Sequence, residues 1–453
     1  MDEISFLNGG SFHRYSLFGT KILVHGSTGA IWQLDDTCWR LLAGEDLSSE
    51  SSGEALAELA AICEEARAAE ARFAQQAALF ASKLETGPMY VKSLCLNVAH
   101  DCNLRCRYCF AGKGAFGGER GLMSGRVGKA ALDLLLQLSG PRKNCEVDFF
   151  GGEPLLNWEL VKELTVYGRE NAAKLGKKIK FTLTTNGLLL DSEKMDFINR
   201  EQLGLILSID GRPEIHDRMR PTAGGGGSHR AVLAKLKEAV ARKTDDNWWV
   251  RGTYTGYNLD FTQDVKYLAE AGFANISLEP VVTDQDYRLR EEELPLIERE
   301  YERLASYYLQ RRREDRPFSF FHFNFDLAKG PCLAKRLLGC GAGHAYLAVS
   351  PKGDLYPCHQ FVGQSAYRVG TVFSGVERPE MSEKFRAAHI LKKEKCRLCW
   401  AQLYCSGGCH ANALAKNGDL LLPDQLGCRI EKKRLECAIV IHVLTGGRAQ
   451  IPA

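Results

Sequence analysis

Three cysteines close together in the sequence are the residues best suited to carry chemistry. They are Cys102, Cys106 and Cys109, in the run Cys-Asn-Leu-Arg-Cys-Arg-Tyr-Cys. Soft thiolate ligands select iron–sulfur clusters, zinc or copper(I). A structural zinc site would need a fourth ligand, usually from paired Cys-x-x-Cys elements, and these three cysteines stand alone. Because a four-iron cluster takes one ligand per iron, three thiolates would leave one iron open to a small molecule.

A second motif follows the cysteines, from Phe149 to Pro154, and reads Phe-Phe-Gly-Gly-Glu-Pro. Gly151 and Gly152 lack side chains, so the backbone there can approach a ligand closely. Glu153 and Pro154 would fix the turn. Alone, such a run would indicate only a turn, but next to the three cysteines it predicts a ligand-binding loop.

Alternating strands and helices are predicted around both motifs. Apolar runs typical of strands occupy residues 90–98, 146–150, 178–184, 203–209, 248–254 and 275–280. Helical patterns fall between them at 124–138, 158–174, 192–199, 229–242 and 261–271. Strands separated by helices indicate a parallel α/β sheet, and a closed barrel would need eight such units. We therefore expect an open, partial (β/α)6 barrel, followed by a helix at 292–313.

Polar and charged residues follow the ends of these predicted strands. In parallel α/β folds the active site lies at the carboxyl ends of the strands, so residues far apart in sequence meet there. The first strand leads into the cysteines and the second into the glycines. Thr184, Ser208, Asp210 and Val281 lie at or just after the ends of other predicted strands, and Arg251 lies within the fifth strand.

The composition is that of a globular protein with several domains. The 453 residues are 45% hydrophobic and 25% charged, and the formal net charge is +3. This balance gives no electrostatic case for a nucleic acid or an anionic membrane as partner. The first residues lack the pattern of a signal peptide, and no apolar run is long enough to span a bilayer. We therefore expect a cytoplasmic protein.

The chain contains 16 cysteines, which are unevenly distributed. Disulfides are disfavoured in the cytosol, so clustered cysteines there indicate metal binding or catalysis. Eight of them lie between Cys332 and Cys428. Five isolated cysteines are expected to be small buried hydrophobic residues; they are Cys38, Cys63, Cys95, Cys145 and Cys437.

The cysteine triplet and the Gly-Gly-Glu-Pro run together resemble the signature of radical S-adenosylmethionine (SAM) enzymes, over residues 90–282. The resemblance implies that SAM binds the open iron of a [4Fe-4S] cluster and yields a 5′-deoxyadenosyl radical, which removes hydrogen from an unactivated carbon. It also implies that Ser208 and Asp210 hold the ribose, although a simple turn after a strand is the alternative. Arg251 would pair with the SAM carboxylate, and Val281 would contact the adenine. The other implied SAM contacts are Tyr108, Gly151, Gly152, Glu153, Pro154 and Thr184.

The C-terminal cysteines resemble the SPASM domain, expected here over residues 316–453. This resemblance implies two auxiliary [4Fe-4S] clusters and therefore three clusters in the chain. The first auxiliary cluster would be bound by Cys340, Cys358 and Cys409, and the second by Cys396, Cys399, Cys405 and Cys428. Cys332 is the candidate fourth ligand of the first cluster, and otherwise a substrate thiolate could bind there. A zinc ribbon at Cys396–Cys409 is the alternative.

Residues 1–85 read as a small domain, ahead of a radical SAM domain at 86–315. Short strands are predicted at 15–18, 21–25 and 30–34, and a helix with one packed face at 53–84. The region resembles a precursor-peptide recognition element, a winged-helix-like domain that adds a leader peptide as a strand to a sheet edge. Weak basic character argues against a DNA-binding winged helix.

Longer stretches bring a narrower resemblance to the maturases of SCIFF peptides (six cysteines in forty-five residues). They include Leu94 to Cys102, Asp148 to Pro154 and Tyr404 to Cys409. This resemblance implies Cys-derived thioether crosslinks, of sactionine or ranthipeptide type, in a ribosomally made Cys-rich precursor peptide. A flavodoxin- or ferredoxin-type protein would be the reductant.

Other functions fit the same motifs. One is thioether formation in a quinohemoprotein amine dehydrogenase subunit. Another is the anaerobic sulfatase-maturating enzymes, which form formylglycine but normally lack the leader-binding domain. They also use a catalytic Asp that the sequence does not locate. A non-enzymatic alternative is a multi-cluster electron carrier or a zinc-stabilised peptide-binding module, which would leave the Gly-Gly-Glu-Pro run, Asp210 and Arg251 without a role.

Overall fold

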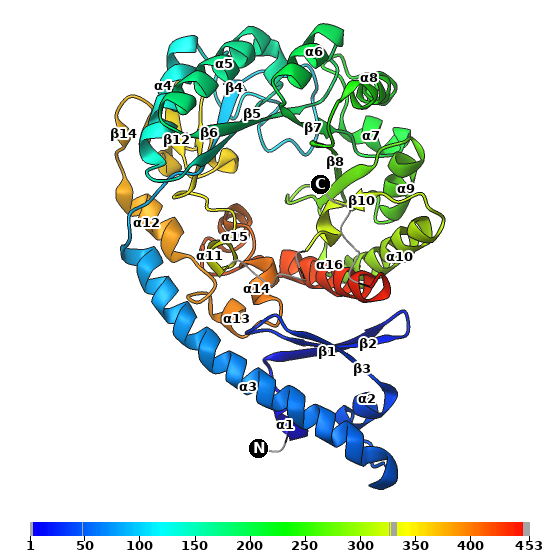
Figure 1. The fold of residues 1–453 in the computed structure, drawn as a ribbon. Coiled ribbons are helices and arrows are strands. Elements are labelled where there is room, and N and C mark those ends of the chain that lie inside the picture. Colours follow the sequence, from blue (N-terminus) through cyan, green and yellow to red (C-terminus); the bar gives the residue numbers. More distant parts are fainter. Residues whose placement is uncertain (1–2, 48, 326, 328–332, 447–453) are drawn as a thin grey trace. The chain divides into compact units, whose positions relative to one another are not determined.

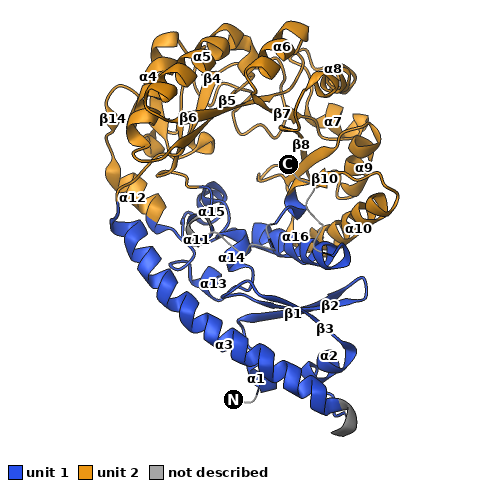
Figure 2. Ribbon diagram, in the orientation of Figure 1, with its two compact units in different colours: residues 1–87, 322–340, 387–451 blue, residues 88–321, 341–386, 452–453 orange. Residues whose placement is uncertain are grey.

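The computed structural model describes residues 3–47, 49–325, 327 and 333–446. The chain divides into two compact units, which Figure 2 distinguishes by colour. Unit 1 combines residues 1–87, 322–340 and 387–451, and unit 2 contains residues 88–321 and 341–386. Residues 341–386 belong to unit 2 because they include strands that extend its central sheet.

Unit 2 is built on one mixed sheet of eleven strands, in the order β10-β9-β8-β7-β6-β5-β4-β11-β12-β13-β14 (Figure 1). Strands β4 to β9 are parallel to their neighbours, and β10 pairs in parallel with β9. The order of strands has two ends, so the sheet does not close into a barrel, and the predicted open α/β fold is confirmed. These strands are β4 (Ser93–Ala99), β5 (Asn144–Gly151), β6 (Lys178–Thr185), β7 (Gly204–Ser208), β8 (Trp248–Tyr254), β9 (Asn275–Pro280) and β10 (Ser319–Phe320).

Helices between the strands cover one face of the curved sheet (Figure 1). Burial alternates along β5, as expected for side chains that point to opposite faces of a sheet. Cys145, Val147 and Phe149 are buried, while the residues between them are more exposed. Helix α4 begins at an N-cap, Ser124, whose side chain accepts from the amide of Val127. The helices are α4 (Gly125–Leu138), α5 (Trp158–Lys174), α6 (Ser192–Arg200), α7 (Pro213–Met219), α8 (His229–Arg242), α9 (Thr262–Glu270) and α10 (Leu294–Arg313).

The other end of this sheet comes from the C-terminal part of the chain. Strand β11 (Tyr346–Val349) pairs in parallel with β4, and the side-chain amide of Asn97 donates to the backbone carbonyl of Val349 over 3.0 Å. Three short antiparallel strands follow: β12 (Asp354–Tyr356), β13 (Gly370–Thr371) and β14 (Gly375–Val376). Helix α12 (Pro379–Ala387) comes next in the chain.

In unit 1, the N-terminal residues form a three-stranded antiparallel sheet and three helices. The sheet order is β1 (Phe12–Leu17), β2 (Thr20–His25), β3 (Ile31–Leu34). Phe18 and Gly19 both have positive φ, as a tight turn between antiparallel strands requires. The helices are α1 (Glu3–Leu7), α2 (Asp36–Leu42) and α3 (Ser49–Thr86).

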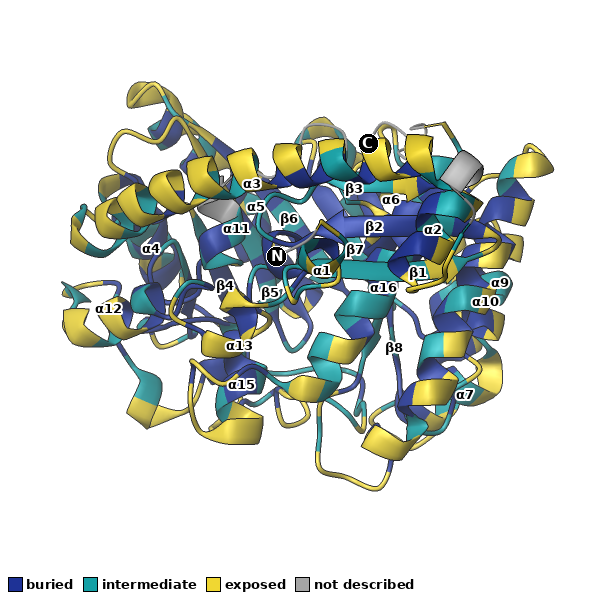
Figure 3. Ribbon diagram, turned by 90° about the horizontal axis from the view of Figure 1, so that it is seen from below, coloured by how far each residue is buried: buried dark blue, intermediate teal, exposed yellow. Residues whose placement is uncertain are grey.

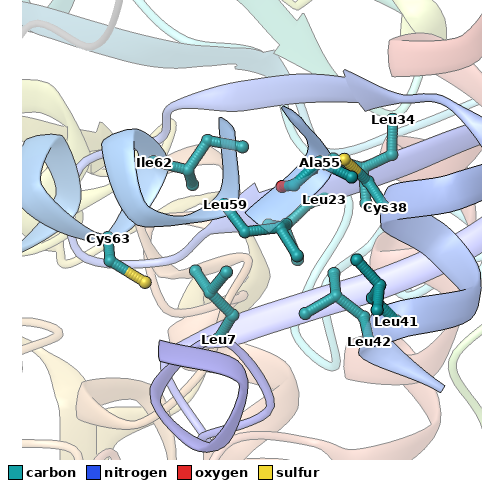
Figure 4. Packing of buried hydrophobic residues seen from close by; sticks show 10 residues of the cluster. All are labelled: Leu7, Leu23, Leu34, Cys38, Leu41, Leu42, Ala55, Leu59, Ile62 and Cys63. Carbon is teal, nitrogen blue, oxygen red and sulfur yellow. Dashed lines mark hydrogen bonds between the residues drawn. The ribbon is translucent and has the colours of Figure 1, made fainter. Parts of the chain in front are cut away.

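The two faces of this small sheet pack against different partners. Figure 4 shows one face, where Leu23 meets side chains from the three N-terminal helices. On the other face, Ile22 and Val24 pack with Trp400, Tyr404 and residues near the C-terminus. The N-terminal region therefore shares a core with the C-terminal helices of the same unit.

Helix α3 has one packed face, as expected, and a broad exposed face that Figure 3 shows in yellow. Polar contacts at two glutamates of α3 join it to other parts of unit 1. His25 contacts Glu70 at 2.9 Å, while His389 and Lys392 contact Glu85 at 2.8 Å and 2.9 Å.

The remaining helices of unit 1 carry Cys396, Cys405, Cys428 and Cys437. They are α11 (Leu333–Leu338), α13 (Glu394–Arg397), α14 (Gln402–Cys405), α15 (His410–Asn417) and α16 (Gln425–Leu444). Throughout the described part of the chain, no helix combines the length and the apolar character needed to cross a bilayer.

Candidate active site at the strand ends

The three N-terminal cysteines lie on the loop that follows β4, at the carboxyl edge of the unit 2 sheet. The loop is held to the segment after α7. The amides of Arg105 and Arg107 donate to the carbonyls of Pro221 and Met219, both over 2.8 Å, and Leu104 forms a bridge with Thr222. These backbone bonds fix the loop that carries the thiols.

The sulfur of Cys102 accepts two hydrogen bonds. The donors are the amide of Leu104 at 3.4 Å and the side-chain amide of Asn186 at 3.8 Å. Asn186 follows β6 and also donates to Asn103 Oδ1 over 2.7 Å. Donors aimed at a sulfur favour its thiolate form, which is the form that binds a metal.

The three thiols are close enough for their charges to interact. Burial raises the pKa of Cys102 to about 11 and that of Cys106 to about 12. Reactive free cysteines have lowered pKa values, whereas a bound metal deprotonates a thiol ligand outright. The raised pKa values of Cys102 and Cys106 therefore do not fit a free, reactive nucleophile.

A buried ion pair adjoins the thiol of Cys106. Asp210, at the end of β7, is fully buried and contacts Arg220 Nη2 over 3.0 Å. Tyr108 donates its hydroxyl proton to the same carboxylate over 2.6 Å, and the amide of Thr253 donates over 2.9 Å. Protein groups thus already surround Asp210, whereas the resemblance implies a ribose contact for it.

The Gly-Gly-Glu-Pro run lies where β4 and β5 end side by side. A Cβ atom on Gly151 would lie 2.3 Å from the carbonyl oxygen of Ala99, and one on Gly152 would lie 2.1 Å from that of Asp101. Gly151 also has φ +123°, which L side chains rarely adopt. The close neighbours are protein backbone, so the glycines are required by the meeting of the two strand ends whether or not a ligand approaches.

Hydrogen bonds to Glu153 link the ends of β5 and β6. Its buried carboxylate accepts from the hydroxyl of Thr185 at 2.6 Å, the amide of Asn186 at 2.9 Å and the amide of Leu155 at 3.1 Å. Burial raises the pKa of Glu153 to about 7. Pro154 begins the short 3-10 helix η1 (Pro154–Asn157).

The other predicted ligand contacts are spread along the same edge. Ser208 is directly opposite Arg251 in the pairing of β7 with β8. The Arg251 side chain is 52% exposed and contacts Glu279 Oε1 at 3.5 Å, so its guanidinium is accessible. Val281 is buried directly after β9, and Thr184 donates its hydroxyl proton to Asp148 over 3.1 Å.

A second group of thiols lies in unit 1. Cys396, Cys399, Cys405 and Cys428 line one pocket of about 210 Å³, together with Lys395, Gln402, Arg429, Lys432 and other residues. These four cysteines come from α13, the following turn, α14 and the first turn of α16. They are the four that resemblance assigns to the second auxiliary cluster.

The proposed ligands of the first auxiliary cluster are divided between the units. Cys340 and Cys409 are in unit 1, where their charges interact, and Cys358 is in unit 2. Cys332 lies outside the described residues. The five isolated cysteines are all buried free thiols, which confirms the prediction for Cys38, Cys63, Cys95, Cys145 and Cys437.

In the described ranges, no three His, Cys, Asp or Glu side chains converge closely enough to hold a single metal ion. A four-iron cluster makes a different demand, because each of its irons takes its own thiolate.

Sequence reasoning did not assign a site role to Asn186 or Arg220. Asn186 lies 84 residues after Cys102, and Arg220 lies 114 residues after Cys106 in the sequence. No spacing rule links such distant positions. The one sequence signal for a role of Asn186 in the site is its position just after the end of a predicted strand.

Comparisons with known proteins agree with this geometry. Residues 96–265 match the model of the Radical SAM superfamily. An uncharacterized protein of Methanocaldococcus jannaschii is 30% identical over 190 residues, which are 42% of this chain and 62% of that protein. The chain therefore spans less than two thirds of that relative.

Two characterised relatives match over more of the chain. The radical SAM cyclopropyl synthase TigE of Paramaledivibacter caminithermalis is 23% identical over 375 residues, 78% of this chain and 74% of that protein. A cysteine-type anaerobic sulfatase-maturating enzyme of Clostridium novyi is 23% identical over 338 residues, 69% of this chain and 86% of the enzyme.

Solved structures match the fold. The structure of anSMEcpe with bound AdoMet has a TM-score of 0.65 at 22% identity and covers 79% of this chain and 99% of its own. Streptococcus suis SuiB bound to S-adenosylmethionine has a TM-score of 0.55 at 15% identity and covers 92% of this chain and 99% of its own. Both matches show the α/β architecture described above.

Proposed function

We propose that this protein is a radical SAM maturase that forms Cys-derived thioether crosslinks in a ribosomally made, Cys-rich precursor peptide. The observation that carries the proposal is the gathering of Cys102, Cys106 and Cys109 on one loop at the carboxyl edge of the sheet, next to the Gly151–Gly152 turn. The named relatives support an enzyme of this kind, because they include a cyclopropyl synthase and sulfatase maturases.

The residues at the sheet edge fit the expected cofactors. Cys102, Cys106 and Cys109 would hold a [4Fe-4S] cluster with one iron left for SAM. When bound, this pair supplies a 5′-deoxyadenosyl radical that takes hydrogen from a substrate carbon.

The chain's own residues would position these groups. Arg251 offers an accessible guanidinium for the SAM carboxylate, with Ser208 on the neighbouring strand. Val281, Thr184 and the turn from Gly151 to Pro154 remain proposed contacts. The Asp210 carboxylate would hold the Tyr108 hydroxyl and the Arg220 guanidinium beside the thiol of Cys106.

Two auxiliary [4Fe-4S] clusters are part of the proposal. The shared pocket of Cys396, Cys399, Cys405 and Cys428 supports one of them. Cys340, Cys358 and Cys409 would hold the other, with either Cys332 or a substrate thiolate as the fourth ligand. We expect a flavodoxin- or ferredoxin-type reductant and a cytoplasmic location.

The N-terminal sheet supports a peptide substrate. In the described residues β3 pairs with β2 on one side only, so its other edge offers backbone groups to an added strand. A leader peptide bound there would raise the local concentration of the linked core peptide. A structure of the fold neighbour SuiB contains its precursor peptide SuiA, which is compatible with this role.

Formylglycine formation is the second candidate, because the sulfatase-maturating relatives align over more than two thirds of this chain. The two reactions differ in what happens to sulfur. A thioether keeps the sulfur and removes two hydrogens per link, whereas formylglycine formation from Cys removes the sulfur.

Mass spectrometry tests the proposal. The reduced enzyme is incubated with SAM and the Cys-rich peptide encoded nearest to it, and free thiols are then alkylated. We expect a loss of two hydrogens and one alkylation site per link, and no change in a peptide whose cysteines are replaced by Ala. An unchanged peptide mass despite SAM cleavage would contradict thioether formation, and loss of sulfur would favour the second candidate.

A further inference from the structure

Lys393 is a buried lysine directly before α13, in the cysteine-rich part of unit 1. The residue is only 1% exposed. Its ammonium donates one hydrogen bond, to the carbonyl oxygen of Gly407 over 2.7 Å. An ammonium has three donors and no acceptor, and across the described residues the Gly407 oxygen is its one hydrogen-bond partner. A buried charge with so few partners is costly unless an anion lies nearby.

The nearby groups that could supply this anion are thiols. The charge on Lys393 interacts with Cys396, Cys405, Cys428 and Cys409, which come from α13, α14, α16 and the turn before α15. Burial lowers the pKa of Lys393, and these four thiolates oppose that change. Three of them line the pocket described above, and Gly407 lines it as well.

The backbone around Gly407 is shaped to admit the ammonium. Ser406, Gly407 and Gly408 all have positive φ, between +60° and +86°. A Cβ atom on Gly407 would lie 3.0 Å from Cγ2 of Ile390 and 3.3 Å from the Lys393 ammonium. The glycine therefore leaves room for both side chains, and its carbonyl oxygen accepts the hydrogen bond from the ammonium.

We propose that Lys393 is a positioning residue for the cluster bound by Cys396, Cys399, Cys405 and Cys428, and that its buried positive charge raises the reduction potential of that cluster. This inference rests on the proposed function, which places a [4Fe-4S] cluster there. Four thiolates give the site a net negative charge, and net charge and hydrogen bonding at the sulfurs are among the factors that set cluster potentials. Adding an electron to a negative site is easier next to a buried cation.

Other cations near the pocket are expected to matter less. Lys395 and Arg429 are exposed and Lys432 is half-buried. Water and salt screen exposed charges, whereas a buried charge acts through a medium of lower dielectric constant. Lys395 therefore provides a matched control, because it is a lysine that lines the same pocket.

The test is a potentiometric titration of anaerobically reconstituted protein, followed by electron paramagnetic resonance. Lys393→Met removes the charge and the donor, Lys393→Gln removes the charge only, and Lys393→Arg keeps the charge. All variants carry Ala at Cys102, Cys106 and Cys109, so that the SAM-binding cluster does not contribute. We expect the Met and Gln variants to make reduction about tenfold less favourable, a fall of about 59 mV for one electron. Lys393→Arg and Lys395→Met should stay near the parent.

The other possible results either support or overturn the proposed role of the Lys393 charge. Loss of iron from the Met and Gln variants with retention in the Arg variant also supports the charge role. Equal potentials in all loaded variants, an equal fall in Lys395→Met, or loss of iron from all three Lys393 variants would overturn the inference. Absence of a cluster at this pocket in the parent protein would instead contradict the proposed function.

Discussion

At the residue scale, the site combines two kinds of side chain. Some are neighbours in the sequence, and others are distant in the sequence and lie next to the thiols only in the folded chain. Cys102, Cys106 and Cys109 could be identified because one loop holds all three, and thiolates have few roles at such spacing. Asn186 and Arg220 could not, because they reach the thiols from distant strand ends and helices. Polar neighbours of this kind are set by tertiary packing, which no local pattern encodes.

The pair of Asp210 and Arg220 gives a stability prediction. Replacing Asp210 by Ala leaves a buried guanidinium without its carboxylate, which should lower the free energy of unfolding by about 3–5 kcal/mol. Urea denaturation of the cluster-free protein measures this change. The double variant Asp210→Asn with Arg220→Met removes both charges and should recover much of the loss. Equal losses in both proteins would show that the ion pair itself is not responsible.

Glu153 gives a prediction of pH dependence. Its pKa in the folded protein is raised from 4.5 to about 7 by burial, so the folded protein holds the proton more tightly than the unfolded chain. The free energy of unfolding should therefore fall as pH rises from about 4.5 to about 7, by up to about 3 kcal/mol from this group.

Urea denaturation across this pH range checks the effect. In Glu153→Gln the contribution is absent, so wild type should lose stability relative to this variant as pH rises. The exposed Glu159 provides the control, since Glu159→Gln should follow the wild-type slope. A difference between wild type and Glu153→Gln that is flat with pH would contradict the assignment.

At the element scale, the alternation of strands and helices was predictable and the C-terminal strands were not. The expected strand at 248–254 and helix at 158–174 coincide with β8 and α5, because each has a clear hydrophobic period. Strands β12 to β14 contain only two or three residues each, too few to show any period. They join the sheet one after another, since β12 pairs with β11, β13 with β12 and β14 with β13, and such pairing is a tertiary property.

The meeting of β4 and β5 gives a prediction for the glycine turn. Gly152→Ala would place a Cβ atom 2.1 Å from the carbonyl oxygen of Asp101, so the strand end or the cysteine loop must shift. We expect loss of most SAM cleavage and a weaker iron signal, measured by 5′-deoxyadenosine yield and iron content. Gly118→Ala is the control, since the nearest atom to its Cβ lies at 3.7 Å and its φ is not positive. Wild-type behaviour of Gly152→Ala would contradict the close packing.

At the scale of the whole molecule, the chain combines a unit built on the eleven-stranded sheet with a unit that contains both the N-terminal sheet and the C-terminal helices. The sequence suggested three separate domains, because composition and motifs change along the chain. Unit 1 nevertheless shares one core between β2 and α16, where Ile22 and Val24 pack with Leu435 and Ile439. Such contacts between distant segments cannot be read from local patterns.

Iron content tests the three-cluster organisation. We expect about twelve irons per chain in the anaerobically reconstituted protein. Replacing Cys396 and Cys428 by Ala should remove about four, and so should Ala at Cys102, Cys106 and Cys109. Cys437→Ala, in the same helix as Cys428 but buried in the core, should keep the full content. Zinc in place of iron would contradict the cluster assignments.

The most direct test of the central claim follows hydrogen from the peptide. The enzyme is reduced and incubated with SAM and a precursor peptide deuterated at its non-exchangeable carbon positions, and 5′-deoxyadenosine is analysed by mass spectrometry. We expect one deuterium to be transferred to 5′-deoxyadenosine for each link formed, and the peptide to lose one deuterium and one exchangeable hydrogen. Formation of undeuterated 5′-deoxyadenosine with an unmodified peptide would contradict it.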